Sequence, residues 1–165
     1  MRWLLAASLA AALSVSGCAS GMQKERAACA AAPMPISRDT AVLDVLHVYT
    51  GSDGVSHADV QQEPGKTTTY LGALLRQFPF GDPSSVVIVS GPPGFHIPMH
   101  PSPYREIFLL LSGSSVIELS DGTQRSLQAG SLVLFEDVTG PGHGGLFGAC
   151  GYVAVDLQFK TATLP

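Results

Sequence analysis

Charge is scarce in this sequence, and no stretch of it is basic. Only 13% of the 165 residues are Asp, Glu, Lys or Arg, against about 25% in an average soluble domain. Disordered chains combine high charge with few apolar residues, so the apolar content of 45% argues against disorder. The 9 Lys and Arg residues form no cluster and are outnumbered by 13 Asp and Glu, which excludes the positive surface that nucleic-acid-binding proteins use. The length fits one domain.

Long apolar runs are also missing, with one short exception near the N-terminus. Residues 3–15 are apolar apart from two serines and follow Arg2, but a helix that spans a bilayer needs about 20 such residues. A short apolar run behind a positive residue is typical of a signal peptide, which we place at residues 1–17. Residues 15–18 (VSGC) resemble the bacterial lipobox, in which a signal peptidase cuts before the cysteine and the cysteine receives lipid. An ordinary secretory signal followed by a stray cysteine is the alternative.

The lipobox resemblance implies a membrane anchor at Cys18. Acyl chains on this residue would hold the protein at a membrane without spanning it. Ala19 stands where an aspartate would retain a lipoprotein at the inner membrane, which favours the outer membrane of a bacterial envelope and a domain that faces the periplasm. Export places the chain in an oxidising compartment, so Cys29 and Cys150 can form a disulfide. Alternatively, Cys150 is a small buried apolar residue.

Strand signals dominate the rest of the chain. We expect a tether at residues 18–38 and one domain at residues 39–165. Within segment 70–78 the apolar residues have the i, i+3, i+4, i+7 spacing of a helix face, so we expect a short helix there, although Gly72 weakens it. Many short strands between turn signals predict an all-β barrel or sandwich. The expected strands are residues 42–49, 55–61, 86–90, 106–111, 115–119, 124–127, 132–135 and 152–160.

The strand expected at residues 106–111 is apolar on both faces beyond its first residue. An antiparallel sheet usually turns one polar face to water. We therefore expect the second face to be covered, either by the N-terminal segment or by a partner subunit, and the second alternative would make the protein a homodimer.

Two glycine-bounded segments carry histidine and glutamate at a defined spacing. Residues 94–113 read GFHIPMHPSPYREIFLLLSG, in which Glu106 follows His100 and precedes a glycine by seven residues. Residues 130–143 contain a glycine, an apolar strand and the sequence GPGH, which ends in His143. These segments resemble the first and second motifs of the cupins, although Ser102 stands where the first motif has its second histidine. The resemblance covers about residues 86–160 and implies a cupin-type jelly-roll barrel.

Strand geometry and this resemblance point to one site. Side chains two residues apart share a strand face, so His100, Ser102 and Glu106 are expected to point the same way. Phe108 would continue this face into the barrel, and His143 could approach from a neighbouring strand. Two histidines and one carboxylate with open positions suit a divalent metal such as iron, zinc or manganese. The metal would polarise a substrate oxygen or activate water.

The same residues also allow a pocket without metal. Serine is a poor ligand for these metals, and the prolines before Glu106 interrupt strand geometry. Glu106 can instead pair with Arg105, Arg76 or His100 at the mouth of the barrel. His96 either replaces the missing histidine or is a turn residue.

The remaining polar residues carry weaker signals. Ser56, His57 and Asp59 are too close in sequence for a nucleophilic triad, whose members converge from separate elements, so we expect His57 to be structural or on the surface. Glu136 and Asp137 are expected to be solvated carboxylates at a strand end, or else to contact a ligand at the barrel mouth.

Two functional hypotheses follow from these observations. The first is a periplasm-facing cupin-fold lipoprotein that acts as a metal-dependent enzyme on a small molecule through His100, Glu106 and His143. The second is a lipoprotein that binds or senses a small molecule in a metal-free barrel without catalysis. Fold alone does not choose between them, because cupins include both enzymes and binding proteins.

Overall fold

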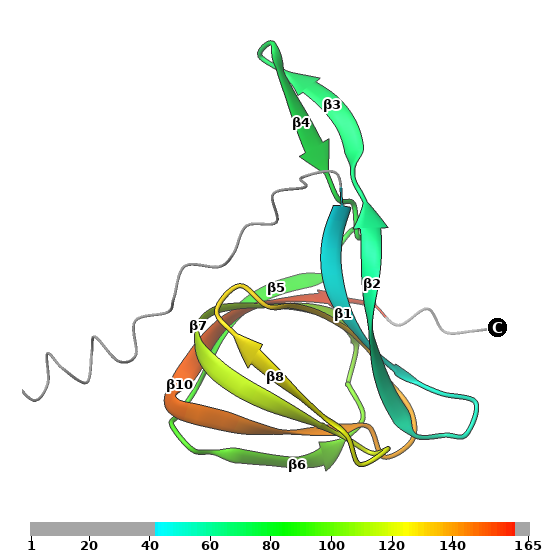
Figure 1. Ribbon diagram of the computed structural model, residues 1–165, viewed down its shortest axis with the longest axis vertical. Coiled ribbons are helices and arrows are strands. Elements are labelled where there is room, and N and C mark those ends of the chain that lie inside the picture. Colours follow the sequence, from blue (N-terminus) through cyan, green and yellow to red (C-terminus); the bar gives the residue numbers. More distant parts are fainter. Residues whose placement is uncertain (1–41, 161–165) are drawn as a thin grey trace, which may run out of the picture. The chain divides into compact units, whose positions relative to one another are not determined.

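The computed structural model describes residues 42–160, which form ten strands and no helix (Figure 1). The expected all-β class is confirmed for this part of the chain. The predicted signal peptide, the tether, Cys18 and Cys29 lie outside the described residues. No helix within residues 42–160 could cross a membrane. The strands are β1 (Val42–Thr50), β2 (Ser56–Pro64), β3 (Lys66–Tyr70), β4 (Ala73–Gln77), β5 (Ser85–Gly91), β6 (His96–His100), β7 (Arg105–Leu119), β8 (Gln124–Gln128), β9 (Leu132–Glu136) and β10 (His143–Phe159).

Eight of these strands form one mixed sheet that curls around its own core (Figure 1). The order is β2-β1-β9-β7-β10-β5, with β8 paired to β7 and β6 paired to β10. The long strands β7 and β10 pair with each other, and each has different partners along its two halves. Among the strand pairs within residues 42–160, only β1 and β9 run parallel. The sheet does not close, so the closed barrel that we expected is not found.

Strand β7 continues through the position where the sequence predicts a break. Gly113 has φ 80° and lies opposite Tyr152, next to shifts in the β7–β10 register. A Cβ atom built at Gly113 would come within 2.0 Å of the Gly151 carbonyl oxygen. Glycine is needed here for a bulge and a close backbone approach. The two expected strands at 106–111 and 115–119 are therefore one bent strand.

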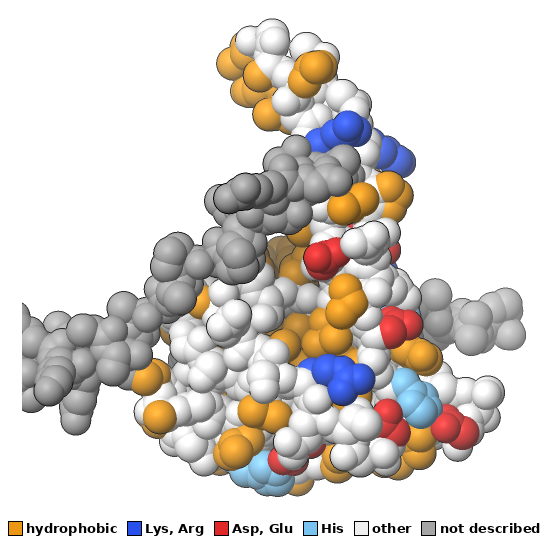
Figure 2. Space-filling view, in the orientation of Figure 1, with side chains coloured by type: hydrophobic (Ala, Val, Ile, Leu, Met, Phe, Trp, Pro, Cys, Tyr) orange, Lys and Arg blue, Asp and Glu red, His pale blue; other side chains and the backbone are white. Residues whose placement is uncertain are grey.

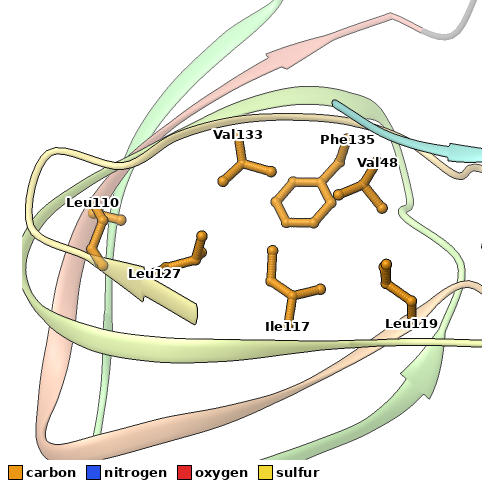
Figure 3. Packing of buried hydrophobic residues seen from close by; sticks show 8 residues of the cluster. Val48, Leu110, Ile117, Leu119, Leu127, Val133 and Phe135 are labelled. Carbon is orange, nitrogen blue, oxygen red and sulfur yellow. The ribbon is translucent and has the colours of Figure 1, made fainter. Parts of the chain in front are cut away.

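The sheet carries a buried apolar cluster on each face. The inner cluster comprises Val48, Leu110, Ile117, Leu119, Leu127, Val133, Phe135 and Ala154 (Figure 3). The outer cluster comprises Val45, Ile107, Leu134 and Phe159. Phe80, from the segment between β4 and β5, packs against the outer cluster. This segment therefore covers part of the second face of β7, whereas the sequence led us to expect the N-terminal segment or a partner subunit there. The homodimer stays a prediction.

The helix expected at residues 70–78 is wrong, because this segment is half of a β-hairpin. Strands β3 and β4 pair with Tyr70 opposite Ala73, and the two residues between them, Leu71 and Gly72, have φ values of 48° and 83°. Two consecutive positive φ values match the tight turn that joins twisted strands. The apolar residues of this segment bury no helix stripe, since Leu71 and Leu74 are exposed.

Besides β3 and β4, two strand segments were missed because their sequences look unsuited to sheets. Strand β6 contains Pro98, which is tolerated because it lies where the β6–β10 register shifts. The first half of β10 is rich in glycine. Cys150, further along β10, is exposed and disulfide-bonded, so the alternative of a buried apolar residue is wrong. Its predicted pairing with Cys29 stays a prediction.

Candidate functional site

A cavity of about 190 Å³ lies within the curled sheet, next to the inner cluster. His100, Glu106 and His143 all line it, and so does Phe108, as the strand parity predicted. The other lining residues are Val89, Ile97, Ser115, Ile117, Leu127, Phe135, Gly144, Gly145, Phe147, Tyr152 and Asp156. The cavity is thus mostly apolar, with acidic groups and histidines contributed by β6, β7 and β10.

Strand pairing explains why two acids face each other in this cavity. Glu106 on β7 lies opposite Gln158 on β10, and Phe108 lies opposite Asp156. Because side chains two apart share a face, Glu106 and Asp156 occupy diagonal positions on the same face. Diagonal neighbours in an antiparallel pair are about 7–8 Å apart at Cα, within reach of long side chains.

Glu106 and Asp156 form a pair of carboxyl groups in the cavity wall. Burial, and next the negative charges of Asp156 and Asp137, raise the pKa of Glu106 to about 8; burial also raises the pKa of Asp156. Asp156 Oδ2 accepts a hydrogen bond from Gln158 Nε2 at 2.8 Å, but its buried Oδ1 has no donor among the described residues when both acids are ionised. The raised pKa keeps Glu106 protonated at neutral pH, so the pair carries one negative charge, and Asp156 Oδ1 can accept a hydrogen bond from a ligand.

Tyr152 belongs to the same end of the cavity. Burial and the charges of Asp156 and Glu106 raise the pKa of its phenol above the ordinary value of 10.0. The phenol therefore stays protonated and remains a hydrogen-bond donor at neutral pH.

A buried carboxylate orients His143 at the cavity wall. His143 Nδ1 lies 2.8 Å from Asp137 Oδ2, and Asp137 is fully buried. Because an ionised carboxylate only accepts, this contact places the hydrogen of a neutral His143 ring on Nδ1 and leaves Nε2 as an acceptor. The ring also stacks on Phe135, with centroids 4.4 Å apart. The expectation of a solvated Asp137 is wrong, because the residue holds the histidine.

His100 approaches His143 because a glycine permits it. Their ring centroids are 5.0 Å apart, and His100 Nδ1 lies 2.9 Å from the Pro98 carbonyl oxygen, which again leaves Nε2 for other contacts. A Cβ atom at Gly142, which has φ 70°, would lie 1.9 Å from the His100 carbonyl oxygen. Glycine before His143 is thus required by close packing.

Ser102 and His96, expected as cavity neighbours, do not line the cavity. The Ser102 hydroxyl donates to Asp137 Oδ1 at 3.0 Å, so Ser102 supports the carboxylate that orients His143. His96 Nε2 lies 2.9 Å from Glu118 Oε2 at an exposed position. His57 bridges Asp53 and Asp121, which agrees with the structural role expected for it.

Neither arginine considered as a partner of Glu106 bonds to it. Arg105 pairs with Glu136, and Arg76 donates to Thr67 Oγ1. Glu136 also contacts His47 at 2.8 Å, so its charge is compensated on the outer face of the sheet. The alternative in which an arginine neutralises Glu106 is therefore wrong.

The metal centre suggested by the cupin resemblance stays a prediction. Within residues 42–160, no three His, Cys, Asp or Glu side chains are grouped so that they could hold an ion. His143 directs one ring nitrogen to Asp137 and keeps Nε2 available, an arrangement that also occurs in metal-binding histidines. We derive no chemical step through a metal.

A larger hollow of about 670 Å³ lies elsewhere, along Phe80, Arg105, Glu136 and Phe159. It is more open than the inner cavity, and its central charges already pair with each other. Of the residues considered for ligand contact, Glu136 lies on it, whereas His100, Glu106 and His143 do not. The inner cavity is the better candidate for specific binding.

Asp156 and Tyr152 were missed, although the sequence contained a signal for both. Residues 152–157 read YVAVDL, and Asp156 has the same parity as Tyr152 and Ala154. An acid at the inward parity of an apolar strand is costly unless it has a partner. Searching for a second inward acid beside Glu106 would have found it.

No protein-family model matches this chain, and the search of curated proteins also finds no match. The functional argument therefore depends on the cavity itself.

Proposed function

We propose that this domain is a small-molecule-binding module of cupin-like, jelly-roll type, whose inner cavity takes a small neutral or cationic molecule with hydroxyl or amine groups. The observation that supports the proposal is one apolar cavity with unused hydrogen-bond acceptors, Asp156 Oδ1 and His143 Nε2. Binding sites of this kind combine apolar walls with a few placed polar groups.

The size of the cavity limits the ligand. A volume of about 190 Å³ equals that of about six water molecules at about 30 Å³ each. Phe108, Phe135 and Tyr152 supply aromatic walls, which favour a compact carbon frame. The ligand is therefore a molecule of a few carbons with one or two polar groups.

The charge of the cavity limits the ligand further. The carboxyl pair carries one negative charge when Glu106 holds its proton, and among the described residues no Lys or Arg lines the cavity. An anionic ligand would enter a low-dielectric space beside a like charge, which is unfavourable. A hydroxyl or amine can donate to Asp156 or to His143, which relieves the unsatisfied acceptors.

Three probes with one carbon frame test this selectivity: isobutylamine, isobutanol and isobutyrate. We expect the amine and the alcohol to raise the melting temperature at neutral pH and the carboxylate to leave it unchanged. Asp156→Asn should remove the response to the amine, whereas Asp44→Asn, at an exposed position, should retain it. Equal responses to all three probes, no response to any, or a response that survives Asp156→Asn would refute the proposal.

Proton transfer is a second candidate function. Asp137 prepares His143 to accept a proton at Nε2, and Glu106, with a pKa of about 8, holds a proton that it can donate at neutral pH. Together they could move a proton between two carbons of a bound carbonyl compound. Exchange of ligand C–H for deuterium, followed by NMR and abolished by His143→Gln, would support catalysis; absence of exchange in a ligand shown to bind would leave binding alone.

We also propose that the module is a lipoprotein of the bacterial envelope. The support is the resemblance of residues 15–18 to a lipobox and Ala19 after the cysteine. Lipid on Cys18 would hold the binding domain at the periplasmic side of the outer membrane.

A further inference from the structure

The β3–β4 hairpin exposes its apolar side chains to solvent. It is a separate two-stranded sheet with no hydrogen-bonded partner in the eight-stranded sheet. The exposed fractions are 64% for Tyr70, 91% for Leu71, 77% for Leu74 and 44% for Leu75. Figure 2 shows these hydrophobic side chains gathered at the end of the hairpin. A cluster of large exposed apolar side chains marks an interaction site.

Both faces of the hairpin near its tip carry an exposed leucine. Leu74 lies opposite Thr69 on one face of the ribbon, while Leu75 lies opposite Thr68 on the other. Leu71 stands at the apex. A groove on a protein partner would cover one face of such a ribbon and leave the other exposed, whereas a lipid layer surrounds both.

Leu71 is an unfavourable residue for its turn position. Its φ of 48° lies in the left-handed region, where Gly, Asn and Asp are preferred and a branched apolar side chain is strained. The turn does not require leucine, and nothing in the fold buries its side chain. Strain and exposure together indicate a contact outside the domain.

Basic side chains lie behind the apolar tip. Lys66 and Arg76 occupy neighbouring levels of the ribbon, since Arg76 lies opposite Thr67, and Figure 2 shows basic side chains beside the hairpin. No Asp or Glu occurs from residue 64 to residue 81, although the chain carries a net charge of −4. The hairpin is thus a locally cationic element in an acidic protein.

We propose that this hairpin inserts its tip into an anionic lipid surface. At about 3.3 Å per strand residue, the apolar levels from Leu71 to Leu75 cover about 10 Å, and Lys66 and Arg76 lie about 13–16 Å from the apex. Interfacial elements insert about 5–10 Å, so the apolar side chains would reach the acyl boundary while the cations meet lipid phosphates. This contact is independent of the ligand proposed for the inner cavity.

A single tryptophan at the apex tests the position of the tip directly. The chain has one tryptophan, Trp3, so the full chain with Trp3→Phe and Leu71→Trp carries a single reporter. With vesicles of phosphatidylcholine and phosphatidylglycerol that contain brominated acyl chains, we expect at least a twofold loss of fluorescence. The matched control replaces Val60, which is 64% exposed on β2, by tryptophan in the same background, and we expect little quenching.

Charge reversal tests the contribution of the basic residues separately from that of the apolar tip. Lys66→Glu with Arg76→Glu should reduce quenching of the apex reporter on anionic vesicles and abolish its preference over pure phosphatidylcholine. Failure to bind vesicles, or an unquenched apex reporter on protein that sediments with vesicles, would overturn the proposal. A dimer in light scattering that Leu71→Asp dissociates, with the apex reporter unquenched, would assign the tip to a second copy instead.

Discussion

Replacing Glu106 by glutamine should reduce the dependence of stability on pH. The folded protein holds the pKa of Glu106 at about 8, above its ordinary value of 4.5. The folded state therefore binds more protons than the unfolded state between these pH values, and stability falls as the pH rises through this window. Below about pH 4.5 Glu106 is protonated in both states and adds no penalty; above about pH 8 the penalty is complete.

The size of this effect is measurable. The difference between the pKa values of 4.5 and about 8 corresponds to a loss of at most about 5 kcal/mol in the free energy of unfolding, because one pKa unit equals 1.36 kcal/mol. Because water reaches the partly exposed Glu106 side chain, we expect the loss in the free energy of unfolding to be about 2–3 kcal/mol. A domain with a total stability of about 5–15 kcal/mol would show such a loss clearly.

Urea unfolding followed by circular dichroism from about pH 5 to about pH 9 provides the measurement. His57, whose pKa is raised chiefly by its hydrogen bond to Asp53, also loses stabilisation as the pH rises above its unfolded value of 6.5, but it does so equally in wild type and variant. The difference between the wild-type and Glu106→Gln curves therefore reports the titration of the Glu106–Asp156 pair. Glutamine keeps a donor for Asp156, so the variant should fold. Parallel curves for the two proteins would refute the carboxyl-pair interpretation, and Asp44→Asn should follow wild type.

Three other substitutions test the site, the fold and the anchor. Asp137→Asn should lower the free energy of unfolding by about 1–3 kcal/mol, because the amide NH2 group would face either the Ser102 hydroxyl or the His143 N–H, which both donate to Asp137. Equal urea midpoints for this variant and Asp44→Asn would contradict this expectation. Gly113→Ala should cost about 3 kcal/mol in thermal unfolding, against about 1 kcal/mol for Gly122→Ala, since both have positive φ but only Gly113 lacks space for a Cβ. Cys18→Ala should release the domain from membranes or leave an uncleaved precursor in fractionation and mass measurements; a cleaved protein with unchanged membrane partition would argue against lipidation.

The sequence predicted the strands whose residue pattern alone determines them. Segments 42–49, 86–90 and 132–135 are apolar or β-branched between turn residues, and they form β1, β5 and β9 within a residue or two. The helix over 70–78 failed because its 3.6-residue spacing competes with a two-residue turn at Leu71 and Gly72. Local periodicity cannot reveal that the segment has nothing to pack a helix face against.

The candidate site was predictable in its location but not in its connections. Spacing and strand parity brought His100, Glu106 and His143 to one cavity. Which group each side chain bonds depends on the β7–β10 register and on Asp137 folding inward after β9. A residue just beyond a strand end gives no parity signal, so its burial could not be derived from the sequence.

The buried acids of this domain differ in how well the fold satisfies them, and that difference locates the function. Asp137 accepts bonds from Ser102 and His143, so its desolvation is offset within the protein. Asp156 has one oxygen without a hydrogen-bond partner among the described residues. Replacing such a pair by apolar residues often stabilises a protein. A fold that retains the pair at the wall of a cavity therefore gives up stability there, as functional sites do. A ligand that donates to Asp156 would recover part of that loss on binding, which is why we assign recognition to this end of the cavity.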